Sequence, residues 1–193
     1  MKYVIYFEPS LEVEKAIIAT RETIKDSIVR VSDKPIHGTL MATRISPYYE
    51  RYFLDRLPLL RCDRFQVSLE DVALFDNDKL VVRVQKNSGL DQLHRSVFDA
   101  VKKFIPREEI KPLSEKYVDD PARVKVYEEL GSPYCGEFYN PHLTIAQVDP
   151  LIMNTLQEES LPGLSGLQFT VDKFSVYRVE KDNYDILGYF FLR

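Results

Sequence analysis

The sequence predicts an α+β fold with two lobes, built from two pseudo-two-fold-related antiparallel sheets with helices on the outside and a central cleft. Three observations predict it. The phrase His-x-Thr, followed by an aliphatic residue, occurs twice, at 37–40 and 142–145. Segments with β-strand alternation are interleaved with amphipathic helical segments along the chain. The two halves also share one order, which runs His strand, helix, long strand, polar turn and return strand.

In the first half, a strand is expected at 3–7, followed by a helix that Ser10 caps. Lys34-Pro35 leads into the first His strand, which runs to about Ile45. Ser46 and Pro47 open a further helix. A long strand at 65–75 and a return strand at 80–84 flank a turn at 76–78. Ser88 is expected to cap the next helix, with a core face of Leu90, Leu93, Val97, Val101 and Phe104.

In the second half, residues 106–139 form a less regular connection with one helix, which Asp119 or Asp120 caps and Gly131 ends. The second His strand begins at Pro141, and Asp149-Pro150 opens a short helix. A strand over 169–179 and a final strand over 186–192 complete the chain. Residues 65–69 correspond to 169–173 in this repeat.

A single bilobal domain, 1–193, is therefore expected. Its first lobe core covers about 36–86, connecting helices and a loop cover about 88–139, and the second lobe core covers about 140–193. The N-terminal strand and helix, 3–29, are expected to pack on the lobes.

The His and Thr of each phrase share one strand face, since side chains alternate with a period of two. His37 with Thr39, and His142 with Thr144, are then expected to face each other across the cleft. One imidazole can act as base and the other as acid, because histidine titrates near neutrality. The threonine hydroxyls can donate hydrogen bonds to anionic oxygens. This chemistry suits attack on a phosphodiester and needs no metal.

Composition narrows the class of protein. The net charge is −4 and the pI is near 5.5, which argues against binding to duplex nucleic acid or anionic membrane by bulk attraction. The two cysteines, Cys62 and Cys135, match no metal-ligand or redox spacing and are interpreted as reduced thiols. No segment resembles a signal peptide or a membrane span. We expect a cytoplasmic monomer, with a nuclear location left open, and no cofactor.

For several other residues, a role in ligand binding must be weighed against simple packing or exposure to solvent. Tyr134 and Tyr139 precede the second His strand and are the preferred candidates for stacking on a base, ahead of Tyr48 and Tyr49. Lys34 lies just before the first phrase and can hold phosphate or point into solvent. Two further residues are expected to lie outside the site: His94 as a packing residue, and Arg44 on the opposite strand face.

The chain resembles the two-histidine (2H) phosphoesterases, a group that includes LigT-like RNA ligases and cyclic nucleotide phosphodiesterases. The resemblance rests on His37-Gly38-Thr39-Leu40, on Asn140-Pro141-His142-Leu143-Thr144-Ile145, on their separation and on the repeat. It implies that His37, Thr39, His142 and Thr144 form a catalytic tetrad, with His142 as base and His37 as acid. Gly38 departs from the family, where an apolar residue is more usual.

The resemblance further implies a metal-independent enzyme that opens 2′,3′-cyclic phosphates of nucleotides or RNA ends to 2′-phosphomonoesters. Alternatives are the processing of 2′-5′ or 3′-terminal RNA linkages, or a non-catalytic protein that binds nucleotides or RNA ends. Ligase activity is left open. The acidic pI favours small or terminal substrates over long RNA.

Overall fold

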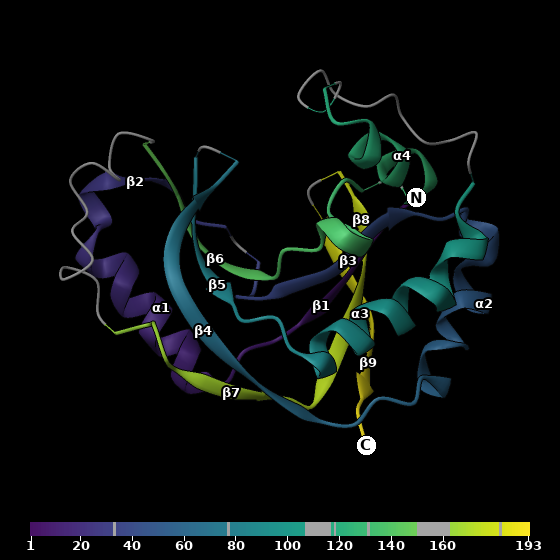
Figure 1. The fold of residues 1–193 in the computed structure, drawn as a ribbon, viewed down its shortest axis with the longest axis horizontal. Helices are drawn as coiled ribbons and strands as arrows, with labels where there is room; N and C mark the ends of the chain where they lie inside the picture. Colours follow the sequence, from purple (N-terminus) through teal and green to yellow (C-terminus); the bar gives the residue numbers. More distant parts are fainter. Residues whose placement is uncertain are drawn as a thin grey trace.

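A computed structural model describes residues 1–32, 34–76, 78–106, 117, 119–130, 132–149, 163–181 and 183–193. Its strands pair in the order β7-β4-β5-β6-β3-β1-β8-β9, and β2 also pairs with β6 (Figure 1). The strands are β1 Lys2–Phe7, β2 Ile28–Arg30, β3 Gly38–Arg44, β4 Phe65–Phe75, β5 Lys79–Val84, β6 His142–Val148, β7 Gln168–Val171, β8 Lys173–Glu180 and β9 Asn183–Phe191.

The sheet consists of two similar halves that meet at one residue pair. In one half the order outward is β3, β1, β8 and β9, and in the other it is β6, β5, β4 and β7. All these pairings are antiparallel, and Gly38 on β3 with Leu143 on β6 is the pair that joins the halves. Each half therefore presents its His strand at the shared boundary. The expected α+β fold with two antiparallel halves is confirmed.

The division of the chain between the halves differs from the expected lobes, 36–86 and 140–193. The first His strand pairs with β1 instead of with the hairpin at 65–84, which pairs with the second His strand. Residues 65–68 are direct partners of 168–171 and are not their equivalents in the repeat. The alternation of apolar residues specifies the buried face of each strand but carries no information about its neighbours.

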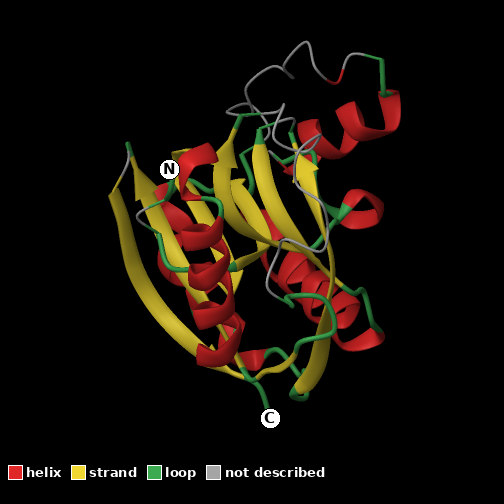
Figure 2. Cartoon of the chain, turned by 90° about the vertical axis from the view of Figure 1, so that its left-hand side faces the viewer, coloured by secondary structure: helices red, strands yellow, loops and turns green. Residues whose placement is uncertain are grey.

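The helices cross between the halves. The principal helices are α1 Leu11–Thr23, α2 Glu50–Leu54, α3 Ser88–Val101 and α4 Pro121–Leu130. Helix α1 lies between β1 and β3 in the chain but packs on β6, whereas α3 lies between β5 and β6 and packs on β3 as well as on β4 of its own half. Strand β2, which follows α1, also pairs with β6. Figure 2 shows α1 in front of the strands that it covers.

One large apolar core fills the space between the sheet and these helices. Its members come from both halves and include Leu40, Leu143 and Ile145, together with Val13 and Ile17 of α1 and Leu93 of α3. Burial of this many large apolar side chains is the main source of stability.

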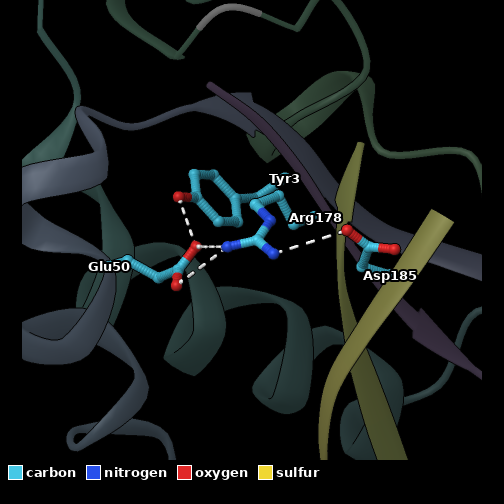
Figure 3. Close-up of polar contacts among 4 residues, drawn as sticks. All are labelled: Tyr3, Glu50, Arg178 and Asp185. Atoms are coloured by element: carbon cyan, nitrogen blue, oxygen red, sulfur yellow. Dashed lines mark hydrogen bonds and ion pairs between the residues drawn. The ribbon is translucent and has the colours of Figure 1, made fainter. Parts of the chain in front are cut away.

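An ion-pair network attaches α2 to the sheet. Arg178 on β8 lies 3.3 Å from a carboxylate oxygen of Glu50, which also accepts a hydrogen bond from the Tyr3 hydroxyl at 2.8 Å. The other guanidinium nitrogen contacts Asp185 on β9 at 3.4 Å, so Arg178 also links the strands of the last hairpin (Figure 3).

Two local expectations change, and two others are not tested. Asn87, not Ser88, caps α3, and its side chain accepts from the backbone of Leu90. The strand expected over 169–179 is two strands that separate at Asp172 and lie in opposite halves of the sheet. The short helix expected from Asp149-Pro150 and the helix end at Gly131 fall outside the described residues.

Candidate active site

The pairing of Gly38 with Leu143 brings the two His-x-Thr phrases together. Both paired residues are buried, so the flanking residues point to the opposite face, called the site face below. The antiparallel register places His37 beside Thr144 and Thr39 beside His142. The two histidines are then diagonal neighbours, which in a regular ladder have Cα atoms roughly 7–8 Å apart. The His strands were expected on facing walls; they lie side by side in one sheet.

The two imidazoles are held in the same way. His37 Nδ1 lies 2.7 Å from the Pro35 carbonyl oxygen, and His142 Nδ1 lies 2.8 Å from that of Asn140. A carbonyl oxygen can only accept, so each Nδ1 carries the proton and donates it. The lone pair of each neutral ring is therefore on Nε2. Matched tautomers follow from the same contact, two residues back along the chain, in both phrases.

An aromatic ring packs on each imidazole. His37 stacks on Tyr6 of β1, with ring centroids 3.6 Å apart and an interplanar angle of 26°. His142 contacts Phe75 at the end of β4, with centroids 4.3 Å apart. Neither aromatic ring was selected from the sequence, because both lie far from the His phrases along the chain.

Burial sets the protonation of the pair in the free protein. Burial, with smaller contributions from the cations of Lys34 and His142, lowers the pKa of His37 to about 4 against the opposing effect of the Pro35 carbonyl. The pKa of His142 is also lowered by burial and by Lys79, whereas Asn140 and Asp76 oppose the shift. Both rings are therefore neutral at pH 7.

Each His strand contains a β-bulge at the fourth residue of its phrase. On β3, Thr39 pairs with Tyr6 and Met41 with Ile5, so Leu40 is the extra residue. The β5 to β6 register likewise pairs Val81 with Thr144 and Leu80 with Ala146, and skips Ile145. The sequence repeat is thus reproduced in the backbone irregularity that follows it. Bulges of this kind recur next to active sites, where they redirect side chains.

The carbonyl of each bulge residue accepts a hydrogen bond from the helix that crosses over from the other repeat. His94 Nδ1 of α3 donates to the Leu40 oxygen at 2.8 Å, and Arg21 Nε of α1 donates to the Ile145 oxygen at 2.7 Å. A bulge interrupts the backbone ladder, so its carbonyl needs such a partner.

His94 is a structural residue, as expected. It is buried, it stacks on Tyr139 with ring planes 2° apart, and its Nε2 accepts from the Gly136 backbone at 3.1 Å. Burial lowers the pKa of His94. It therefore connects the first His strand to the loop before the second.

Gly38 is required by packing. A Cβ atom at this position would overlap the ring of Phe7, which is fully buried and pairs with Gly38 across β1 and β3. Glycine therefore replaces the apolar residue that is usual at this position because an aromatic ring lies directly against the backbone of the His strand.

The three predicted substrate-binding residues lie in three different environments. Lys34 lies beside His37 and places its Nζ 4.2 Å from the Tyr184 ring centroid. Tyr134 donates to Asp76 at 2.6 Å and packs on Phe75, so it reaches His142 through that ring. Tyr139 is only 3 % exposed in the core beneath the sheet, so the expectation that it stacks on a ligand is wrong.

The expected face of Arg44 is also wrong. Simple alternation from His37 turns Arg44 away, but the bulge at Leu40 shifts the alternation by one residue. Arg44 pairs with Lys2 and shares the face of Ala42 and Thr39. Tyr48 and Tyr49 contact one another and Tyr52 at the start of α2.

Two features are absent from the described part of the chain. Within it, no group of three or more His, Cys, Asp or Glu side chains is arranged to hold a metal ion. No helix there is long and apolar enough to cross a membrane.

Comparison with known proteins gives a family model and several solved structures to which this chain is similar. Residues 30–183 match the family model of the 2′-5′ RNA ligase superfamily. None of the curated proteins compared with the chain matches it.

Several solved structures have the same fold. LigT of E. coli, in complex with NADP+, is 16 % identical with a TM-score of 0.66, and the match covers 99 % of this chain and 97 % of LigT. The protein TT0787 of Thermus thermophilus is 18 % identical with a TM-score of 0.66, over 100 % and 98 % of the two chains. Usb1 of Kluyveromyces marxianus is 14 % identical with a TM-score of 0.51, over 97 % of each chain.

Proposed function

Because this chain belongs to the 2′-5′ RNA ligase superfamily of 2H phosphoesterases, we propose that it hydrolyses the 2′,3′-cyclic phosphodiester of nucleotides or RNA ends. The product is the 2′-phosphomonoester with a free 3′-hydroxyl. The observation that carries the proposal is the juxtaposition of His37, Thr39, His142 and Thr144 around the Gly38–Leu143 pair, with both imidazoles in the same tautomer.

The reaction follows from this arrangement. Nε2 of His142 takes a proton from water as the water oxygen bonds to phosphorus. The bond from phosphorus to O3′ breaks, and the His37 imidazolium gives its proton to O3′. The hydroxyls of Thr39 and Thr144 donate to the non-bridging oxygens, which carry the developing charge. The pair of histidines neither gains nor loses a proton in this step. Proton exchange with solvent then returns His142 to the neutral form and His37 to the imidazolium.

Which histidine acts as the acid and which as the base depends on the bound substrate. In the free protein burial and Lys34 disfavour a proton on His37, and burial and Lys79 disfavour one on His142 more than Asp76 favours it. The family roles, with His37 as acid, therefore require that the bound phosphate anion stabilises the His37 imidazolium. Titration belongs to the coupled pair, not to either ring alone.

Ligands in the relatives agree with a phosphate site. LigT of E. coli was crystallised with phosphate, 3′-AMP, ATP and NADP+. All four contain phosphate, and three contain adenosine.

The proposal is tested by turnover of 2′,3′-cyclic nucleotides with a chelator present, for the wild type, His37→Gln and His142→Gln. We expect metal-independent turnover to 2′-phosphate and a loss of about 100-fold or more in each variant. Turnover that survives in either variant excludes paired catalysis. Binding without turnover in the wild type favours a nucleotide-binding protein.

A second substrate separates acid from base. A phosphodiester with a 4-nitrophenyl leaving group needs little help from an acid, because nitrophenolate leaves without a proton. His37→Gln is then expected to recover most of its activity, whereas His142→Gln stays impaired. The reverse pattern exchanges the two roles.

A further inference from the structure

The site face continues across three strands from Thr39 to the edge of the sheet. Thr39 pairs with Tyr6, Tyr6 with Ser175, and Ser175 with Tyr189 on β9. Paired residues share a face, so Tyr189 lies on the face of the His/Thr tetrad. Strands are about 4.8 Å apart, which places β9 roughly 14 Å from the first His strand. A mononucleotide bound at the tetrad does not cover this distance.

The outer strand presents apolar rings to solvent on this face. The register puts Tyr184, Ile186 and Phe191 on the same face as Tyr189. Ile186, Tyr189 and Phe191 are 45 %, 51 % and 76 % exposed, which is unusual for neighbours on one strand. We call these four residues the β9 platform. Leu187 and Phe190 of the same strand pack into the core, so the exposure does not come from a strand out of register.

Cations flank the platform at both ends. Lys34 lies over Tyr184, and Lys173 lies 5.0 Å from the Tyr189 ring centroid while it pairs with Glu8 at 3.2 Å. The register adds Lys2 and Arg44 to the same face. Rings interleaved with cations are the combination that binds single-stranded nucleic acid, in which bases stack and phosphates contact the cations.

The platform is held in place from behind. Arg178 joins β8 to β9 through Asp185 and also contacts Glu50 on α2 (Figure 3). Arg178 pairs with Tyr3, the register neighbour that lies on the face opposite to Tyr6, so these contacts are on the side of the sheet away from the site face. The rings of the platform are therefore presented on a fixed hairpin, so stacking costs little ordering of the protein.

The corresponding surface of the other half is less suited to a polyanion. A polar hollow beside His142 contains Arg83 and Lys86, but Glu70 lines it as well and Asp71 pairs with Arg83 at 3.5 Å. The charge balance therefore favours the β9 side.

We propose that the β9 platform, with Lys34 and Lys173, binds the nucleotides of a single-stranded RNA whose terminal phosphate occupies the His/Thr tetrad. The inference rests on the proposed function and adds the substrate class: an RNA end of several nucleotides, in preference to a cyclic mononucleotide. The overall acidic charge, which argues against long RNA, is offset by a local basic and aromatic surface.

The test compares a 2′,3′-cyclic mononucleotide with an oligoribonucleotide that ends in a 2′,3′-cyclic phosphate. In the wild type the oligonucleotide is expected to have the higher kcat/KM. Tyr189→Ala and Phe191→Ala should each lower kcat/KM for the oligonucleotide about tenfold, through KM, and leave the mononucleotide unchanged. Tyr52→Ala, an exposed ring on α2, is the matched control and should change neither substrate.

Equal values for the oligonucleotide in wild type and platform variants overturn the inference, even if the mononucleotide is hydrolysed and the proposed function stands. If neither substrate is hydrolysed, the proposed function fails. Fluorescence anisotropy of a labelled oligonucleotide with a 3′-phosphate then tests RNA binding by the platform independently of catalysis. Binding that Tyr189→Ala weakens supports it, and binding that is absent or unchanged refutes it. A change of oligomeric state in Phe191→Ala, with RNA binding intact, would assign the surface to a second copy of this chain.

Discussion

Each histidine of the tetrad is positioned by contacts with groups outside its own phrase. The imidazoles are fixed by carbonyls two positions back and by rings from other strands, and the same burial that fixes them removes their charge. The His-x-Thr phrases could be found in the sequence because their chemistry is local. Tyr6 and Phe75 could not, since contact with the histidines depends on strand pairing.

The pH dependence of catalysis follows from these residues. The profile of kcat/KM reports the free enzyme, in which the pKa of both histidines is lowered, so we expect its optimum below pH 6.5. The profile of kcat should lie at higher pH, because the bound anion favours imidazolium. Initial rates between pH 4 and 8 measure both.

Lys34→Ala provides the internal check on this assignment. Removal of the cation raises the pKa of His37, so the acidic limb of kcat/KM should move to higher pH. An acidic limb at or above pH 6.5 in the wild type would contradict the expected effect of burial.

The close approach at Gly38 predicts a large effect of one methyl group. Gly38→Ala forces the added carbon into the Phe7 ring and should lower the free energy of unfolding by about 1–3 kcal/mol. Gly163→Ala is the control, because a Cβ there meets no atom within 4 Å and the backbone is not left-handed. Urea unfolding of both variants measures the difference; equal stabilities would mean that Phe7 moves aside freely.

At the scale of elements, the two bulges and the two crossing helices form one arrangement that occurs twice. Each helix supplies the hydrogen-bond donor that a bulge carbonyl lacks, so the curvature of each His strand depends on a helix from the other repeat. Helix and strand boundaries were largely predictable from caps and alternation. The bulges were not, and for that reason the expected face of Arg44 was wrong.

The bulge contacts predict a selective loss of activity. His94→Phe keeps a ring against Tyr139 but removes the donor to Leu40, and Arg21→Met does the same for Ile145. We expect kcat to fall about tenfold with KM nearly unchanged, because the tetrad is displaced without loss of a binding group. His94→Asn, which restores a donor near the position of Nδ1, should recover part of kcat.

If the contacts of His94 affect only the stability of the fold and not the position of the tetrad, the pattern is different. In that case His94→Phe would lower the unfolding temperature, and kcat measured well below that temperature would equal the wild-type value.

For the whole molecule, the sequence could predict the class of fold and the existence of a repeat, because both follow from periodicity and order. It could not predict which strands share a half. The strands expected at 65–75 and 80–84 were assigned to the first His strand and in fact accompany the second. Neighbouring strands are chosen by the packing of the complete core, to which both repeats contribute.

Acid is expected to destabilise the whole fold through its histidines. The pKa of His37 is about 4 when folded and near 6.5 when unfolded, so the unfolded chain binds more protons between these values. The free energy of unfolding should therefore fall as the pH decreases through this window, with His37 responsible for on the order of 2 kcal/mol between pH 7 and pH 5. Urea unfolding at both pH values, for wild type and His37→Gln, isolates this contribution. The same pH dependence in both proteins would refute it.

Because the helices cross between the halves, one repeat of this chain is not expected to fold by itself. A strand-helix-strand repeat made alone, such as residues 1–45, would leave its His strand uncovered, because its helix and β2 belong on the strand of the other repeat. Two copies could cover each other by reciprocal exchange. Residues 1–45 alone are therefore expected to be stable only as a dimer in which each helix covers the His strand of the other copy, so the two halves of the site are not independent folding units.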